Sequence, residues 1–245
     1  MANHSRFASD DVARLLADNG ICDLDSAFEV GASLDIEHEP RATRHANKRV
    51  VKVDLKGSAG AKSLYIKRQW GRVRWLPRPT DIRHRINLWC SPIHEWRGLR
   101  MLQAAGFHVS EPLAIFWSGW GYSRGAVVTR AVPPARSMSD LVHSGELEQL
   151  DSVKRDSLIE AATKVVARLH RARISWRSMK AKHFYPEDLG GNRWRIWLID
   201  CEGVYRWASR RDCEREWQTY LGYFTSHSPA LHNAFLDAYS LALKV

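Results

Sequence analysis

Long apolar runs are missing from this 245-residue sequence, which argues against a helical membrane protein. A helix that spans a bilayer requires about 20 consecutive apolar residues, and no segment approaches that length. The first thirty residues also lack the apolar centre of a secretory signal peptide, because aspartates interrupt them at positions 10, 11, 18, 23 and 25. We therefore expect a cytoplasmic protein.

Cysteine is scarce and widely spaced, with four residues in the whole chain. The four form no Cys-x-x-Cys pair and have no histidines at zinc-finger intervals, so we expect reduced thiols and no structural zinc site. Internal repeats and low-complexity segments are absent as well. A chain of this length with 44% hydrophobic residues can bury one substantial core or two modest ones, and we expect two lobes.

Acidic residues are outnumbered, since 27 Asp and Glu face 37 Lys and Arg, for a net charge of +10. Such a surplus favours polyanionic partners, among them nucleotides, nucleic acid, phospholipid and phosphorylated glycans. The surplus is densest between residues 67 and 85, where Trp70 and Trp75 lie among basic side chains. Arginine binds phosphate and indoles stack on sugars or bases, which predicts an acceptor-binding or membrane-docking segment. The alternative is a solvated basic loop whose tryptophans cover the core. The basic residues are Lys67, Arg68, Arg72, Arg74, Arg78, Arg83 and Arg85.

Two alternating segments in the first half predict a β-hairpin. "RVVKVDL" and "KSLYIKRQ" alternate apolar and polar residues, and residues 57–61 between them contain the glycines that a turn prefers. This alternation sets Lys67 on the strand face opposite to Leu64 and Ile66.

A helix over residues 91–106 should follow, because serine and proline open it and glycine ends it. Glu95 shares the apolar stripe of this helix with Leu99 and Leu102. A buried carboxylate normally acquires a cationic partner, and Lys67 on the preceding strand is the natural candidate. The alternative is that Glu95 lies at the edge of the stripe and is solvated.

The second half contains a connector, a long helix and another hairpin. "GAVVTRAVPP" predicts a short buried strand that ends at two prolines and links the lobes. Residues 158–169 keep the apolar spacing of a core helix. In "EDLGGN", the Gly-Gly-Asn run predicts the turn of a β-hairpin. In a hairpin folded about this turn, paired residue numbers add to about 383, which sets His183 opposite Asp200. The alternatives are a hairpin with one polar residue at each base, or a hydrolytic metal site that includes His170.

These parts, in this order, resemble those of protein-kinase-like enzymes. More closely, "YIKRQ", "HEWRGLRML", "LHRARISWRSMKAKHFYP" and "IDCEG" resemble the bacterial lipopolysaccharide core kinases, in particular the InaA-like branch of the WaaP and Kdo kinase superfamily. The resemblance spans residues 48–204. It implies an α+β, bilobal, protein-kinase-like fold. Residues 1–130 would form a small N-terminal lobe with the sheet and the Glu95 helix, and residues 131–245 a larger, mainly helical C-terminal lobe.

The resemblance also implies a binding site for ATP and Mg²⁺. Lys67 would hold the α- and β-phosphates and pair with Glu95, as an active nucleotide pose requires in such kinases. Asp200 and His183 would bind Mg²⁺, and Lys180 would add positive charge at the γ-phosphate. The adenine would meet the backbone of Thr129, Arg130, Ala131 and Val132.

Ser178 departs from the family pattern, because it stands where these kinases have the aspartate that orients and deprotonates the acceptor hydroxyl. A serine is no base near neutral pH, and positioned acid–base catalysis is worth about 10²–10⁴ in rate. Phosphoryl transfer depends mostly on positioning and charge neutralisation, so turnover can persist without the aspartate. The glycine loop is also reduced, since Gly31 stands alone, although backbone amides there could still bind phosphate.

Three functions remain open on the sequence. The first is a kinase that phosphorylates a heptose or Kdo hydroxyl of the lipopolysaccharide core at the inner face of the cytoplasmic membrane. Its partners would be the core glycolipid, the anionic membrane surface and a partner or carrier protein. The second is a pseudokinase that binds nucleotide or a partner without turnover, because Ser178 replaces the aspartate. The third is a basic nucleic-acid-binding protein, which we rank last because no nucleic-acid motif appears.

Overall fold

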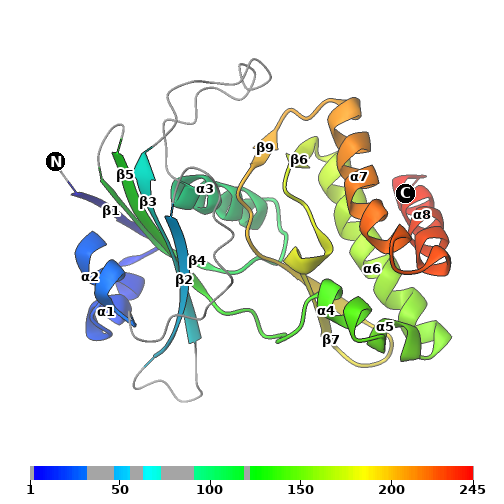
Figure 1. Ribbon diagram of the computed structural model, residues 1–245, viewed down its shortest axis with the longest axis horizontal. Coiled ribbons are helices and arrows are strands. Elements are labelled where there is room, and N and C mark those ends of the chain that lie inside the picture. The colour runs from blue at the N-terminus through cyan, green and yellow to red at the C-terminus, as the bar shows by residue number, and fades with distance from the viewer. Residues whose placement is uncertain (1–2, 32–46, 56–62, 73–90, 119–121, 245) are drawn as a thin grey trace. The chain divides into compact units, whose positions relative to one another are not determined.

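The computed structural model describes residues 3–31, 47–55, 63–72, 91–118 and 122–244 (Figure 1). The chain divides into two compact units. The first unit comprises residues 1–100 and 111–131, and the second comprises residues 101–110 and 132–245. The predicted phosphate loop that follows Gly31 lies outside the described residues, as does the part of the basic segment that follows Arg72.

The first unit is built on a five-stranded antiparallel sheet of β1 (Asn3–Phe7), β2 (Asn47–Asp54), β3 (Ser63–Arg72), β4 (Pro112–Ser118) and β5 (Tyr122–Arg130). The strand order is β1-β4-β5-β3-β2. The predicted hairpin is the β2–β3 pair, in which Asp54 lies opposite Ser63 and Val50 opposite Lys67. On its other side, Lys67 lies opposite Val127 of β5. Its position is therefore fixed by pairing on both edges of β3.

Helices lie on both faces of this sheet (Figure 1), and each face carries a hydrophobic cluster. On one face, α1 (Asp10–Asp18) and α2 (Leu24–Glu29) pack on Leu64 and Ile66. On the other face, Ile93 and Trp96 of α3 (Ser91–Ala104) pack on β4 and β5. Because side chains alternate along a strand, Lys67 belongs to the α3 face.

Helices and two small sheets form the second unit (Figure 1). Its helices are α4 (Met138–His143), α5 (Glu146–Gln149), α6 (Ser152–Arg171), the 3₁₀ turn η2 (Ala181–His183), α7 (Arg210–Thr225) and α8 (Pro229–Lys244). Its strands are β6 (Ile174–Trp176), β7 (Phe184–Asp188), β8 (Trp194–Leu198) and β9 (Val204–Arg206), paired as β6–β9 and β7–β8.

The core of the second unit lies between α6, α7 and α8. The predicted core helix over residues 158–169 lies within α6 and buries its apolar stripe. Aromatic rings fill the space against α8, with Trp217 stacked on Tyr239 and Phe224 stacked on Phe235 at 3.9 Å between centroids in both pairs. None of the helices in the described part of the chain is long and apolar enough to cross a bilayer.

The predicted hairpin of the second unit is β7–β8. Gly190, Gly191 and Asn192 form its turn, and all three adopt positive φ angles of 77°, 60° and 57°. Phe184 lies opposite Leu198, so paired residue numbers add to 382, one fewer than predicted. His183 therefore comes just before the ladder, where its carbonyl accepts a hydrogen bond from the Ile199 N–H at 3.1 Å.

Candidate functional site

The first unit holds a buried ion pair between a strand and a helix. The Lys67 Nζ lies 2.7 Å from the Glu95 Oε2, and the two side chains are only 16% and 7% exposed. β3 presents Lys67 to the α3 face of the sheet, and α3 presents Glu95 from the stripe that it shares with Leu99 and Leu102. The predicted partnership is thus confirmed, and the solvated alternative for Glu95 is wrong.

This pair places one positive charge at a defined depth in the first unit. Because both charged groups are shielded from water, each needs the opposite charge of the other. Removal of one partner typically lowers protein stability by about 3–5 kcal/mol. A lysine held in this way cannot swing freely into solvent. An ammonium group held in this way suits the binding of an anion such as phosphate.

Arg68 lies on the opposite face of β3 and has a structural role. It is buried, and its guanidinium donates to the carbonyls of Ala27, at 2.7 Å, and Val30 at the end of α2. A cation is favourable beside the unsatisfied carbonyls of a helix C-terminus. The prediction that Arg68 belongs to an exposed basic docking segment is therefore wrong.

In the second unit, the loop that contains Ser178 is tied to the chain that follows Asp200. Ser178 donates its hydroxyl hydrogen to the Glu202 carbonyl at 2.7 Å. Gly203 has a φ of +87°, and a side chain there would approach Ser178 Oγ within 3.9 Å. One residue before Ser178, the Arg177 N–H points to the Gly203 carbonyl at 3.4 Å. The Ser178 side chain is therefore held in one orientation, in which its hydroxyl hydrogen is already bonded to a backbone carbonyl.

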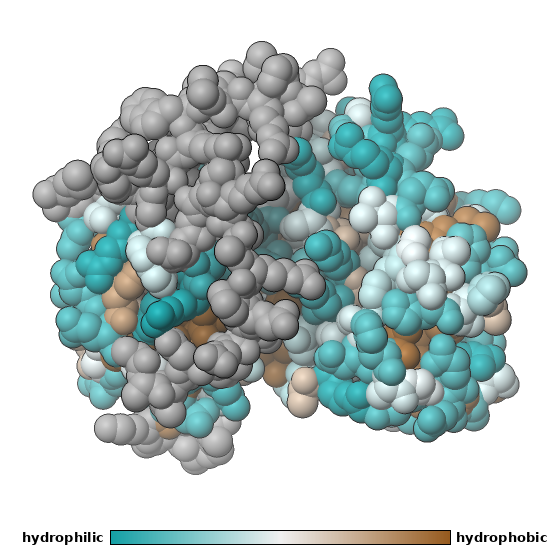
Figure 2. Space-filling view, in the orientation of Figure 1, coloured by the Kyte–Doolittle hydropathy of each residue, from teal (hydrophilic) through white to brown (hydrophobic). Residues whose placement is uncertain are grey.

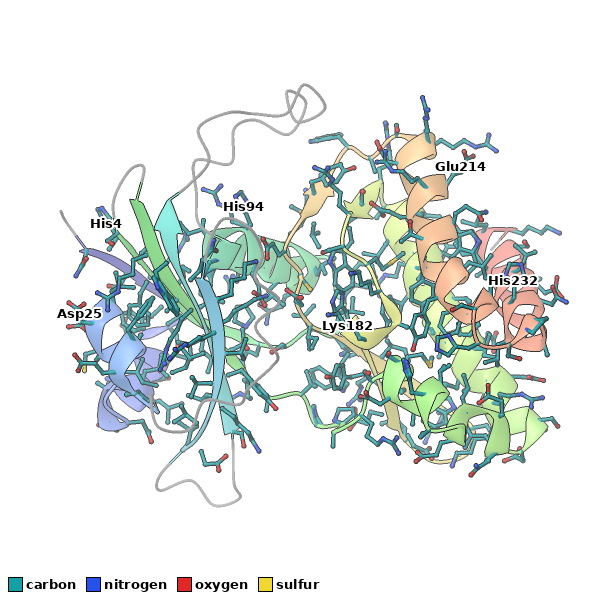
Figure 3. All side chains as sticks on the ribbon, in the orientation of Figure 1. His4, Asp25, His94, Lys182, Glu214 and His232 are labelled. Atoms are coloured by element: carbon teal, nitrogen blue, oxygen red, sulfur yellow. The ribbon has the colours of Figure 1, made fainter. Side chains whose placement is uncertain are left out.

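His183 and Asp200 lie side by side, as the hairpin predicts. The His183 Nε2 is 3.4 Å from the Asp200 Oδ2, and the aspartate side chain is 37% exposed whereas the histidine is buried. Trp176 stacks on the imidazole at 5.5 Å between ring centroids. Asp200 adopts a φ of +54°, a left-handed conformation that aspartate tolerates better than most residues. The neighbouring Lys180 and Lys182 are exposed to solvent, and Figure 3 labels Lys182.

Glu216 of α7 holds the strand before the Ser178 loop, and the sequence interpretation missed it. This buried carboxylate accepts hydrogen bonds from the Ser175 hydroxyl and, at 2.9 Å, from the Trp176 N–H. It also lies 3.6 Å from the His170 Nε2, whose ring bonds through Nδ1 to the Tyr239 hydroxyl at 2.6 Å. A carboxylate on the apolar stripe of an aromatic helix was the signal, of the same kind that pointed to Glu95.

A metal ion would find one carboxylate and one imidazole at the hairpin. Mg²⁺ at phosphoryl-transfer sites keeps several waters and binds one or two carboxylates together with substrate phosphates, a role that fits Asp200. The His183 nitrogen suits first-row transition metals better. Within the described ranges, no group of three or more metal-binding side chains occurs. The pair therefore fits an ion shared with a phosphate ligand, and the interpretation as a hydrolytic metal site with His170 is wrong.

The connector after β5 has part of its backbone already engaged. The Arg130 N–H donates to the Glu111 carbonyl and the Ala131 N–H donates to the Ser63 carbonyl, both at 2.9 Å. Thr129 is buried in the sheet. The N–H groups of Arg130 and Ala131 are therefore already satisfied within the first unit.

A cavity of about 420 Å³ lies in the second unit beside α4, α5 and the β7–β8 hairpin. Pro134, Arg136, Asp188 and Trp194 are among the residues that line it. Ser178, His183 and Asp200 are not among its lining residues, so the cavity is separate from the His183–Asp200 pair.

Comparisons with known proteins give one family and one fold. A model of the family described as the lipopolysaccharide kinase (Kdo/WaaP) family matches residues 35–239. Among solved structures, the chain is similar to one described as WaaP in complex with acyl carrier protein, with a TM-score of 0.60 and 16% identity. The similarity covers 87% of this chain and 81% of that chain. No curated protein matches significantly. At this identity the likeness shows the fold, and it confirms the predicted α+β, kinase-like class.

Proposed function

Since the chain belongs to the lipopolysaccharide kinase (Kdo/WaaP) family, we propose that it is an ATP- and Mg²⁺-dependent phosphotransferase. Its acceptor is a hydroxyl of heptose or Kdo in the lipopolysaccharide core. The observation that carries the proposal is the Lys67–Glu95 ion pair at 2.7 Å, because kinase-like enzymes need such a lysine to hold the nucleotide phosphates. The His183–Asp200 pair supports it from the second unit.

Each of these groups has a distinct role in the proposal. Lys67 neutralises charge on the α- and β-phosphates, and Glu95 keeps its ammonium in place. Asp200 and His183 would hold the metal ion, which would supply positive charge where phosphoryl transfer develops negative charge. Residues 1–130 act as the nucleotide-binding lobe and residues 131–245 as the catalytic lobe, with the adenine against residues 129–132.

The transfer step needs little from Ser178. The acceptor oxygen bonds to the γ-phosphorus while the bond from that phosphorus to the bridging oxygen breaks, and ADP leaves with the electron pair. In a loose transition state, the hydroxyl proton can depart late to water or to the transferred phosphoryl group. Lys180 contributes charge near the γ-phosphate. We therefore expect turnover that is slower than with an aspartate at position 178.

A pseudokinase is the second candidate, favoured by the hydrogen bond that directs the Ser178 hydroxyl to the Glu202 carbonyl. Ser178→Asp distinguishes the two. A gain of about 10²–10⁴ in the rate of phosphoryl transfer would show that the base missing at position 178 limits an active kinase. A zero rate in both proteins, with intact nucleotide binding, would favour the pseudokinase.

The acceptor and the carrier complete the proposal. The core glycolipid lies in a membrane, so we propose that the protein acts at the inner face of the cytoplasmic membrane on an anionic surface. The solved WaaP structure is described as a complex with acyl carrier protein, and a carrier protein is accordingly our candidate protein partner. Nucleic acid binding has no support beyond net charge and the basic tryptophan-containing segment, most of which lies outside the described residues.

Calorimetric titration of ATP, with and without Mg²⁺, tests the nucleotide site without knowledge of the acceptor. We expect binding that requires the metal and is lost in Asp200→Ala and Lys67→Ala. Asp156→Ala removes an exposed aspartate from α6, in the unit that contains Asp200. This control should bind ATP as the wild type does. Absence of binding in the wild type under all conditions would contradict the proposal, as would equal binding in all variants.

A further inference from the structure

Trp207, directly after β9, is the most exposed large hydrophobic residue in the described part of the chain. It is 81% exposed, whereas the side chains of Trp96, Trp176 and Trp217 are buried. A solvated indole forfeits the large apolar burial that normally explains a tryptophan. A single exposed apolar side chain is ordinary in a soluble protein, so the exposure of Trp207 matters here together with its backbone conformation and the charges around it.

The backbone holds Trp207 in a conformation that a bulky residue avoids. Its φ is +69°, and Arg173, which directly precedes β6 on the neighbouring segment, has a φ of +52°. The Ala208 N–H donates to the Arg173 carbonyl at 3.0 Å, and Ser209 then caps α7 through a reciprocal bond with Asp212. These bonds on both sides keep the turn in place although glycine would fit it without strain. The indole is therefore presented outward at a cost to folding.

Basic side chains surround this turn. Arg173, Arg206 and Arg211 are exposed, and among the residues that the structure describes neither Arg206 nor Arg211 forms an ion pair. Arg210 is also exposed, with 94% of its side chain accessible, but it pairs with Glu214. Hydrophilic residues dominate the visible surface around β9 and the start of α7 (Figure 2).

The geometry of the turn points to a bilayer and not to a small ligand. A pocket for a sugar or nucleotide is concave and encloses its ligand, whereas an indole that is 81% exposed encloses nothing. Tryptophan favours the headgroup level of a membrane, and arginine favours anionic headgroups. We propose that Trp207, with Arg173, Arg206 and Arg211, is a docking surface for an anionic lipid bilayer.

This surface lies on the same strand pair as the Ser178 loop. Val204 of β9 pairs with Trp176, two residues before Ser178, and Trp207 is three residues beyond Val204, or roughly 10 Å along a strand. The inference deepens the proposed function and rests on it in one respect: a bilayer at Trp207 would bring a membrane glycolipid to the loop that contains Ser178 and Lys180.

Vesicle flotation of the full-length protein tests the surface without nucleotide. The probes are vesicles of phosphatidylcholine alone and vesicles with an equal share of phosphatidylglycerol. We expect binding to the anionic vesicles only, and a fall of at least fivefold in the partition coefficient of Trp207→Gly. The partition coefficient of the double variant Arg206→Gln/Arg211→Gln should fall about thirtyfold, because each basic group near an anionic membrane contributes roughly fivefold. Glycine suits the backbone at position 207, so loss of fold should not mimic loss of binding.

The matched control is Lys164→Gln/Lys244→Gln, which removes two exposed charges from α6 and α8 of the same unit. It should change binding less than threefold. Equal losses in control and test variants would overturn the proposal, because net charge alone would then explain binding. Undiminished binding of Trp207→Gly, absence of wild-type binding, or full competition by soluble glycerol phosphate would overturn it as well. Calorimetry with ATP is a separate measurement, so failure of the kinase proposal would be recognised independently.

Discussion

At the scale of single residues, Lys67 and Glu95 depend on each other, because each would be a buried unpaired charge alone. Glu95→Gln should therefore lower the free energy of unfolding by about 3–5 kcal/mol and abolish ATP binding. Lys67→Met/Glu95→Leu, which removes both charges, should recover much of the stability and none of the binding. Urea denaturation and ATP calorimetry measure the two effects.

The control for this pair is Glu160→Gln, which breaks the exposed Glu160–Lys164 pair on α6. Exposed pairs contribute little, so the loss should stay below about 1 kcal/mol. If the double variant of Lys67 and Glu95 is no more stable than Glu95→Gln, mutual compensation is not what stabilises the pair.

His183 should influence which metal ion supports nucleotide binding. An imidazole nitrogen favours Mn²⁺ over Mg²⁺ relative to an amide oxygen. We expect His183→Asn to lower the ratio of ATP affinity in Mn²⁺ to that in Mg²⁺ by at least threefold. His227→Asn, at an exposed position at the end of α7, should leave this ratio unchanged, and an unchanged ratio in His183→Asn would remove the imidazole from the metal site.

At the scale of elements, α7 anchors the strand that leads to the Ser178 loop. Glu216 accepts two hydrogen bonds there, and an amide in its place can satisfy only one donor well. Glu216→Gln should cost about 1–3 kcal/mol and should increase hydrogen exchange at the Trp176 amide. Glu214→Gln, on the exposed side of the same helix, is the control. Unchanged exchange at Trp176 in Glu216→Gln would show that α7 does not hold this strand.

The packing of α7 also predicts a protected thiol. Burial, and to a lesser degree the carboxylates of Glu216 and Asp212, raise the pKa of Cys213 to about 11. A raised pKa leaves the thiol protonated below that value, so at pH 8 only about one molecule in a thousand carries the reactive thiolate. Iodoacetamide at pH 8 should therefore modify the exposed Cys22 first and Cys213 only after unfolding. Peptide mass spectrometry reads both sites, and equal native rates would contradict the burial of α7.

At the scale of the whole molecule, the division into two units predicts how the chain unfolds. Leu64 lies in the core of the first unit and Leu158 in that of the second, and both are fully buried. Replacement of either by alanine should cost about 2–5 kcal/mol. If each unit unfolds cooperatively by itself, each variant should lower a different calorimetric transition, by on the order of 10 °C. A single transition that both variants lower equally would mean that the units unfold together.

The parts of the fold and site that the sequence predicts are those with a strong local period. Alternation on β3 put Lys67 on the face away from Leu64 and Ile66, and helical spacing put Glu95 on the apolar stripe of α3. A buried carboxylate needs a cation, which pointed to the Lys67–Glu95 pair. The Gly-Gly-Asn turn set the hairpin register within one residue and so brought His183 beside Asp200. The short helices α1 and α2 were missed, although Ser9 and Asp23 cap them, because six to nine residues carry too little periodicity.

By itself, the sequence determined the β2–β3 and β7–β8 hairpins, the helices α3 and α6, and the turn that brings Asp200 back to His183. Only the tertiary structure decided which other charges are buried and which aromatic residue is exposed. Arg68 is satisfied by carbonyls near residue 30, and Glu216 by donors about forty residues earlier. The turn at Trp207 is held by the bond from the Ala208 N–H to the Arg173 carbonyl, about 35 residues earlier in the chain. Local patterns report neighbours within a few residues, whereas burial and hydrogen bonding are set by whichever distant segments pack there.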